Sequence, residues 1–137
     1  MKYEPEQARV HPTEIRNAII KKTTLGYEDH GILTFWLHCE GDGWGCGFGG
    51  FALDAYDKAT DRRVSTAFGA ACISAVLQTL ELDCWEKLPG TAVRVDTEGL
   101  GGRIRRLGHL IKDQWLDIAA LAEAYDTDGK KSATGEE

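Results

Sequence analysis

Apolar side chains recur along residues 31–54 in a pattern that predicts two strands joined by a tight turn. Residues 32–40 are rich in β-branched and aromatic side chains and carry apolar groups on both faces, so we expect an inner strand that is covered on both sides. Gly41-Asp42-Gly43 then supplies residues that tolerate the backbone angles of a hairpin turn. We expect the rest of the domain to be organised around this hairpin.

The second strand of this hairpin has one face without side chains. Glycine weakens a strand, so four glycines on one face indicate the close approach of another backbone, an aromatic ring or a ligand. We expect a helix or a neighbouring chain to lie flat on this face, and a small-molecule slot is the alternative. The glycines do not form a dinucleotide-binding fingerprint, because they alternate within a strand and no helical pattern follows. The bulky residues are Trp44, Cys46 and Phe48, and the bare positions are Gly43, Gly45, Gly47 and Gly49.

Helical and alternating patterns define the remaining elements. The longest apolar helix pattern follows Ser65, which we expect to be its N-cap. The loss of strict alternation at Arg105-Arg106 predicts a β-bulge. The charged segment 54–63 lacks apolar periodicity and is expected to be a loop or a short exposed helical turn. The expected elements are strands over 16–27, 32–40, 44–50, 91–97 and 103–112, a long helix over 65–82 and a short helix capped by Asp117.

The order of these elements, β-β-β-α-β-β-α with tight connections, predicts an α+β domain. We expect an antiparallel sheet of about five strands, with the long helix packed on one face and a short C-terminal helix. In this prediction residues 14–125 form the single domain, between a flexible N-terminal arm over 1–13 and a disordered polar tail over 126–137.

Composition narrows the class of protein. The 137 residues are 42% hydrophobic and 28% charged, as in an ordinary globular domain, and no apolar run is long enough for a membrane span. The first residues lack the apolar stretch of a signal peptide, so we expect a cytoplasmic protein. The formal net charge of −6 argues against a nucleic-acid binder that works by neutralising phosphates. It fits plain solubility, or a protein that docks on a basic partner.

The cysteines have neither the C-x-x-C spacing of a zinc site nor a secretory context. We expect no disulfide, no bound metal and no cofactor, since free cysteine at apolar positions behaves as a small hydrophobic residue. The four cysteines are Cys39, Cys46, Cys72 and Cys84.

Catalytic motifs are missing from the sequence, which contains no nucleophile elbow, no H-E-x-x-H motif and no P-loop. An enzyme would have to work through His109 and Asp113, or through His30 and Asp29. We therefore interpret the chain as a non-enzymatic protein.

One basic patch and two tryptophans are the candidate binding groups. Arginine presents a fork that holds phosphates and carboxylates through two hydrogen bonds, although pairing with Asp96 and Glu98 across the predicted hairpin is the alternative role. The residues expected to bind an anionic ligand are Arg103, Arg105, Arg106 and His109. Trp36 is expected in the core, whereas the residues expected to contact a protein partner are Trp44, Trp115, Asp54, Asp57 and Asp61.

Four strings of the sequence carry a resemblance to other proteins: LGYEDHGI at 25–32, FGGFALD at 48–54, WEKLPGTAVRV at 85–95 and GHLIKDQWL at 108–116. They resemble a group of small, uncharacterised proteins encoded by tailed phages and prophages, and the likeness runs over roughly residues 17–125. The resemblance implies a phage accessory protein. Small phage proteins of this kind are frequently inhibitors that bind a bacterial defence complex or sequester its signal.

The leading hypothesis is therefore a phage accessory protein that acts in the host cytoplasm as an inhibitor of a bacterial defence complex, of anti-CRISPR type, and that forms a homodimer. The alternative is a sponge that binds a nucleotide signal through the glycine face and the arginines. A small enzyme is the third hypothesis.

Overall fold

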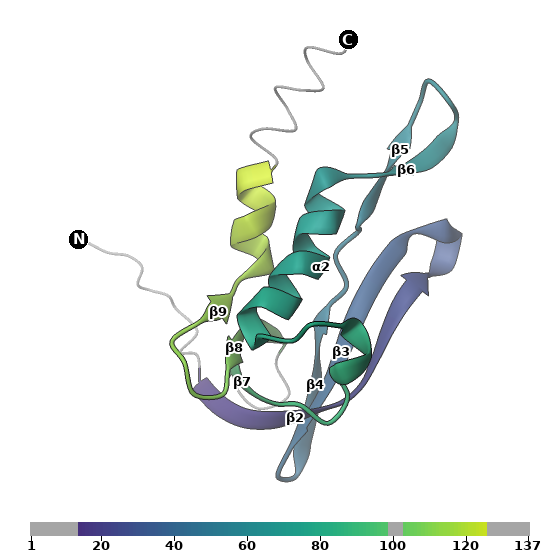
Figure 1. Ribbon diagram of the computed structural model, residues 1–137. Helices are drawn as coiled ribbons and strands as arrows, with labels where there is room; N and C mark the ends of the chain where they lie inside the picture. The colour runs from purple at the N-terminus through teal and green to yellow at the C-terminus, as the bar shows by residue number, and fades with distance from the viewer. Residues whose placement is uncertain (1–13, 99–102, 126–137) are drawn as a thin grey trace, which may run out of the picture.

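The computed structural model describes residues 14–98 and 103–125 (Figure 1). Within them, six strands form one antiparallel sheet in the order β4-β3-β2-β7-β8-β9, and two strands form a separate hairpin. The sheet strands are β2 (Glu14–Tyr27), β3 (Leu33–Gly41), β4 (Trp44–Gly49), β7 (Ala92–Thr97), β8 (Ile104–His109) and β9 (Trp115–Leu116). The hairpin consists of β5 (Asp54–Asp57) and β6 (Arg62–Ser65). The helical elements are α2 (Ala67–Leu80), a helix over residues 118–125, and the 3-10 turns η1 (Asp29–Gly31) and η2 (Trp85–Lys87).

Strand β2 belongs to both halves of the sheet. Residues 14–19 pair with β7, and residues 19–27 pair with β3. A register shift after Ile20 leaves Lys21 without a partner in β3, and such a bulge bends a strand and increases its twist. The sheet curls, and its edge strand β4 lies beside β8 without being its hydrogen-bonded neighbour in the strand order. Strands β4, β3, β2, β7 and β8 thus form a partly open barrel with the Greek-key strand connectivity of an OB-fold.

The concave face of the sheet and the two helices share one apolar core. Helices α2 and 118–125 lie side by side over this face (Figure 1), and the rings of Phe68 and Tyr125 are 6.0 Å apart. Helix α2 contributes Cys72, Val76 and Leu80, which recur at the four-residue spacing of one helical face. The sheet contributes Ala18, Ile20, Phe35, Leu37, Cys39, Phe48, Val93, Val95, Ile104 and Leu107.

The start of α2 is fixed by a polar cap and by a glycine. The N-cap is Thr66 rather than the expected Ser65, because the Thr66 Oγ1 accepts a 3.0 Å hydrogen bond from the Gly69 N–H and donates one to the Leu53 carbonyl. A Cβ on Gly69 would lie only 1.9 Å from that Leu53 carbonyl oxygen, so glycine alone lets the first turn approach this closely. Glu81 ends the helix in the left-handed conformation, with φ 58°.

The α+β class is confirmed, but the predicted number of strands is wrong. The part of the chain that the structure describes has eight strands, against the expected five or so. Segment 54–63 was expected to be a loop or a helical turn and instead belongs to the β5-β6 hairpin. This hairpin extends away from the sheet (Figure 1), so neither of its strands has a core face that would produce apolar alternation. The predicted strand 103–112 ends at His109, and the next residues lead to the two-residue strand β9.

The bulge predicted at Arg105-Arg106 is confirmed. Asp96 pairs with Arg106 and the adjacent Thr97 pairs with Ile104, so Arg105 is the extra residue of β8. The bulge therefore directs Arg105 and Arg106 into different surroundings.

The expectation that β3 is covered on both faces is wrong for the described structure. Phe35, Leu37 and Cys39 are buried on the concave face, whereas on the outer face only Thr34 is buried and Trp36 and His38 are half-buried. The reason is that both helices lie on the same side of the sheet (Figure 1). The expected arm over 1–13 and tail over 126–137 lie outside the described residues, as do residues 99–102 of the expected hairpin loop.

Candidate functional site

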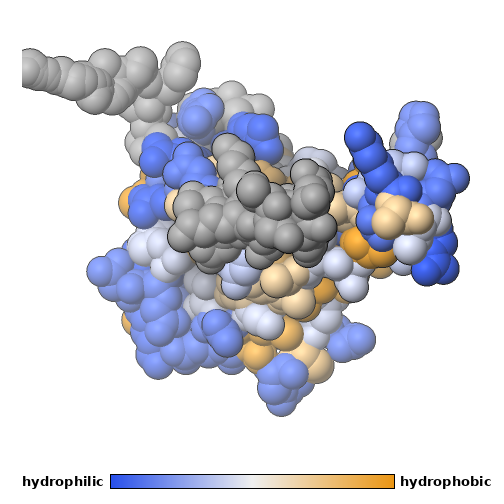
Figure 2. Space-filling view, turned by 90° about the horizontal axis from the view of Figure 1, so that it is seen from above, coloured by the Kyte–Doolittle hydropathy of each residue, from blue (hydrophilic) through white to orange (hydrophobic). Residues whose placement is uncertain are grey.

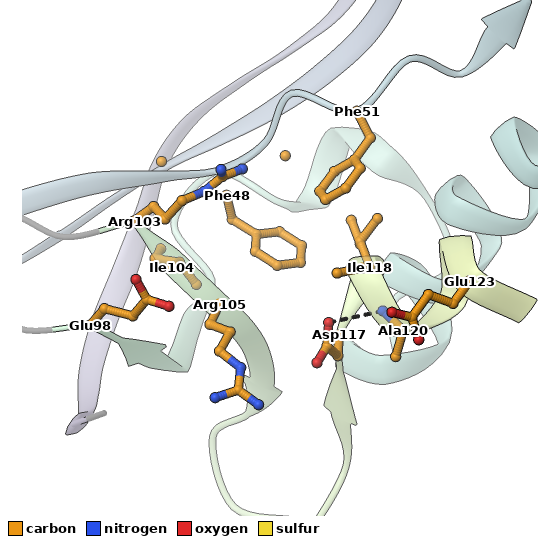
Figure 3. A pocket seen from close by; sticks show the side chains of 13 residues that line it. Phe48, Phe51, Glu98, Arg103, Ile104, Arg105, Asp117, Ile118, Ala120 and Glu123 are labelled. Carbon is orange, nitrogen blue, oxygen red and sulfur yellow. Dashed lines mark hydrogen bonds between the residues drawn. The ribbon is translucent and has the colours of Figure 1, made fainter. Parts of the chain in front are cut away.

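A cavity of about 560 Å³, called here the β4-β8 pocket, lies where the barrel is open between β4, β8 and helix 118–125. Its volume falls within the usual range for small-molecule sites, about 300–1,000 Å³. The apolar lining consists of Phe48, Phe51, Ile104 and Ile118, with the bare backbone of Gly47 and Gly49 beside them. The charged lining consists of Arg103, Arg105, Glu98, Asp117 and Glu123. Figure 3 shows Arg103, Arg105 and Glu98 on one side of Phe48, and Asp117, Ile118 and Glu123 on the other.

Arg103 and Arg105 are the unpaired cations of this pocket. Both side chains are exposed, and neither makes a hydrogen bond or an ion pair with a described residue. Their neighbour Arg106 is different, because its Nε donates a 2.8 Å hydrogen bond to Oδ2 of the buried Asp96. Of the four residues expected to bind an anion, two therefore line the pocket. The expected pairing across the hairpin holds for Arg106 alone.

The opposite wall of the pocket is the first part of helix 118–125. Asp117 is its N-cap, as predicted: Oδ1 accepts a 3.1 Å hydrogen bond from the Ala120 N–H, and the backbone carbonyl accepts one from the Leu121 N–H. The cap fixes the orientation of the carboxylate. No described group bonds to the second oxygen, Oδ2. Glu123 stands one turn further along on the same side of the cavity (Figure 3).

Trp115 is half-buried and packs against arginines of the protein itself. The guanidinium groups of Arg94 and Arg106 lie over its ring, with their Cζ atoms 4.7 and 4.5 Å from the ring centroid. The ring also covers Gly108, where an added Cβ would be 2.6 Å from a ring carbon. Oδ1 of Asp96 is buried and has no hydrogen-bond partner among the described residues. The stack therefore forms a structural unit on the outer face of β7, β8 and β9.

The three carboxylates expected to contact a basic partner lie in or at the β5-β6 hairpin and bond to it. The Arg63 guanidinium donates 2.8 and 3.0 Å hydrogen bonds to Oδ1 of the buried Asp54, and this interaction holds the pKa of Asp54 below its usual value. Asp57 accepts hydrogen bonds from the Ala59 N–H and from the Thr60 hydroxyl. Asp61 accepts one from the Tyr56 hydroxyl. Their first role is to shape the hairpin and its turn.

Trp44 packs against the core and has the guanidinium of Arg16 above it, 5.6 Å from the ring centroid. Nearby, Cys39 and Cys46 are opposite each other in β3 and β4, and burial raises the pKa of the Cys39 thiol to about 12. All four cysteines are free thiols. Within the described residues, no three potential metal ligands lie together.

The histidines of the enzyme hypothesis have local structural roles. Nδ1 of His109 accepts hydrogen bonds from the backbone N–H groups of Ile111 and Lys112, at 3.1 and 3.0 Å, and so shapes the turn after β8. No hydrogen bond or ion pair links His109 to Asp113 in the structure as described. His30 adopts a left-handed conformation in η1, with φ 65°, and the side chain of Asp29 lies outside the described parts.

The glycine face of β4 is covered by an aromatic ring of the protein itself. The Trp36 ring lies over Gly47 and Gly50, where added Cβ atoms would be 3.0 and 2.5 Å from it, and its indole N–H donates to Glu28 at 2.8 Å. This is the outer sheet face that OB-folds use for oligonucleotides. In this protein the Trp36 ring on that face already packs with one side against Gly47 and Gly50. The β4-β8 pocket is therefore the better candidate site.

Comparison of the chain with protein-family models, with curated proteins and with solved structures gives no match. No helix in the described ranges is long and apolar enough to span a membrane. The argument for a function therefore depends on the geometry of the pocket.

Several pocket residues were not expected from the sequence. Phe51 belongs to no periodic apolar pattern in the sequence, and Asp117 was identified only as a helix cap. Both reach the pocket because the sheet curls until β4 lies beside β8, a long-range feature that no local spacing encodes. The features of the sequence that did point to this site were the arginines and the glycines of β4, since residues of both groups line the same cavity.

Proposed function

We propose that the protein is a non-enzymatic binding protein that captures a small organic anion of nucleotide type in the β4-β8 pocket. The observation that carries the proposal is that Arg103 and Arg105, neither with a partner among the described residues, line one cavity together with Phe48 and Phe51. The lining also carries Glu98, Asp117 and Glu123, so the two arginines are the positive part of a mixed-charge pocket.

The two guanidinium groups account for the anionic part of the ligand. An arginine fork binds phosphate through charge-assisted hydrogen bonds, each worth about 1.5–3 kcal/mol. Arg103 and Arg105 need not give up an internal ion pair to do so, which Arg106 would have to do. Binding at the first two therefore costs less reorganisation.

The apolar floor accounts for the remainder of the ligand. Phe48 and Ile118 are almost fully buried, and the half-buried Phe51 offers the accessible aromatic surface against which a flat ring can pack. Gly47 and Gly49 contribute to this edge of the cavity, while the positions that their Cβ atoms would occupy lie against the Trp36 ring and the Phe35 carbonyl. A nucleotide combines the required parts, a flat ring and a phosphate.

The resemblance to small phage and prophage proteins supplies a biological setting for such a pocket. A phage protein that sequesters a nucleotide signal would prevent activation of the bacterial defence that depends on the signal. Such a sponge requires tight binding and no turnover, which agrees with the non-enzymatic interpretation.

The test is isothermal titration calorimetry with AMP, GMP, CMP, UMP and inorganic phosphate. We expect at least one nucleotide to bind, and the double variant Arg103→Ala/Arg105→Ala to lose about 10- to 100-fold in affinity, which corresponds to one or two charge-assisted hydrogen bonds. Arg62→Ala is the matched control, since Arg62 is also an exposed arginine without a described partner but lies in β6, far from the pocket lining. Equal affinity for wild type and the double variant would contradict the proposal.

A second candidate function, inhibition of a defence complex by direct protein contact, is favoured by the β5-β6 hairpin. The hairpin stands away from the sheet (Figure 1) and exposes Tyr56 and Val64 to 54% and 39%. From above, most of the visible surface is hydrophilic, with hydrophobic patches confined between polar side chains (Figure 2). An aromatic residue on a projecting hairpin is a suitable interface anchor.

This candidate is tested by pull-down of the tagged protein from a host lysate that contains the defence complex. We expect Tyr56→Ser to abolish co-purification of a stoichiometric complex and Tyr27→Ser to leave it intact, because Tyr27 is even more exposed, at 74%, but lies in β2. Recovery of the complex with both variants would exclude the hairpin as the contact.

A further inference from the structure

A second cavity, of about 500 Å³, lies on the outer face of the sheet where β2 pairs with β7, and is called here the β2-β7 groove. Its centre is a row of three side chains, because Ile19 pairs with both Glu40 of β3 and Ala92 of β7, and residues opposite each other share a face. Leu110, which follows β8, lines the same groove. Both helices lie over the concave face (Figure 1), so no described helix covers this groove.

Apolar side chains are exposed in and beside the groove. Ile19 is 40% exposed, and Leu110 is similarly accessible. Ile111, the next residue in the chain, is 82% exposed, more than any other large hydrophobic residue that the structure describes. The turn that carries it is held by His109, whose Nδ1 accepts hydrogen bonds from the N–H groups of Ile111 and Lys112. A fixed turn therefore presents an isoleucine that buries little surface within its own chain.

Unpaired charges of both signs border the groove. Lys21 is the extra residue of the β2 bulge, and Glu40 and Asp42 lie on the other side of Ile19, at the end of β3 and in the turn after it. All three side chains are exposed, and none makes a hydrogen bond or an ion pair with a described residue. A purely basic or purely acidic partner would match only one sign of charge, whereas a second copy of this chain brings both.

We propose that this face is the contact surface of a two-fold symmetric homodimer. In the dimer, Ile111 of each copy enters the β2-β7 groove of the other, and Lys21 of each faces Glu40 and Asp42 of the other. A two-fold contact uses the same patch on both copies, so the patch must contain every group together with its complement. This face meets that requirement, because a cavity, an exposed isoleucine and charges of both signs adjoin one another.

The apolar contact is tested by sedimentation equilibrium of the purified full chain over a range of concentrations. We expect the wild type to dimerise and Ile111→Ser to raise the Kd about 100-fold, because burial of each of the two isoleucines contributes about tenfold. The monomer should fold equally well in both proteins, since Ile111 is exposed. Val64→Ser is the matched control, because Val64 is an exposed β-branched residue of β6 outside the groove.

Charge reversal tests the second contact. Lys21→Glu places like charges opposite each other and should raise the Kd about tenfold, whereas the double variant Lys21→Glu/Glu40→Lys should restore it. Lys58→Glu changes the net charge equally at an exposed position between β5 and β6, and should leave the Kd unchanged.

Two results would overturn the proposal directly: a wild type that stays monomeric at about 100 μM, or one whose mass grows beyond two chains. A dimer that neither Ile111→Ser nor Lys21→Glu weakens would overturn it as well, because that dimer would use another face.

Discussion

Arg105 and Arg106 are neighbours on β8, yet the fold treats them in opposite ways. Arg106 lies against Trp115 and donates to the buried Asp96, so its charge is neutralised inside the protein. Arg105 is the extra residue of the bulge, has no described partner and lines the β4-β8 pocket with Arg103. The comparison shows that the register of the strand, and not the residue type, decides whether an arginine pairs with a buried carboxylate or lines the pocket.

Alanine variants of Arg105 and Arg106 should differ most clearly in the stability of the fold. Arg106→Ala leaves the Asp96 carboxylate buried without its cation, which should lower the free energy of unfolding by about 3 kcal/mol. Arg105→Ala removes only an exposed side chain and should change it by less than about 0.5 kcal/mol. Urea denaturation followed by circular dichroism measures both. Equal losses in the free energy of unfolding for the two variants would contradict the distinction between Arg105 and Arg106.

The outer-face stack offers a second way to test the comparison. Gly108→Ala places a Cβ 2.6 Å from the Trp115 ring, so the ring must leave its position against Arg94 and Arg106. We expect a loss of about 1–3 kcal/mol in stability and a shift of tryptophan fluorescence toward longer wavelength. Gly26→Ala is the control, because an added Cβ there meets no atom within 4 Å. A destabilised control and an unaffected Gly108→Ala variant would show that the stack is not structural.

The smallest expected effect concerns a third arginine, Arg63, which pairs with Asp54. Hydrogen bonds from Arg63 lower the pKa of Asp54 in the folded protein relative to its ordinary value of 3.8. The stabilisation is therefore fully present well above pH 3.8 and is lost as the pH falls through the folded pKa. Thermal unfolding between pH 6 and pH 3 should show a steeper decline for wild type than for Asp54→Asn. If the stability of Asp54→Asn falls as steeply with pH as that of the wild type, other carboxylates dominate the pH dependence. Asp113→Asn, at an exposed position, is the control for removing a carboxylate that is not buried.

The sequence predicted those parts of the fold that have a buried face. Strands β2, β3, β4, β7 and β8 and helix α2 were recognised because each alternates or repeats apolar residues against the core. Even the bulge at Arg105-Arg106 could be predicted, because it interrupts the alternation of apolar and polar residues. The β5-β6 hairpin was missed because it has no core to face, and its only local signals were the β-forming residues Tyr56 and Val64.

The candidate site could be predicted only in part. Arg103 and Arg105 stood out as a basic cluster, but nothing local distinguishes them from Arg106, whose partners come from β7 and β9. Trp115 was expected at an interface, and its packing against two arginines depends on the pairing of three strands. Predicting such a site requires the register between distant strands as well as the residue types.

Strand β2 also has a consequence for the order in which the protein folds. Its second half pairs with β3, which follows directly in the chain, whereas its first half must wait for β7 at residues 92–97. During synthesis, the β2-β3-β4 meander can therefore form early, while the barrel closes only after β7 and β8 have left the ribosome. Helix α2 precedes β7 and β8 in the chain, so it is the first element that can cover the concave side of β3, with Phe35 and Leu37. We therefore expect the apolar face of the meander to be protected from aggregation by α2 before the barrel closes.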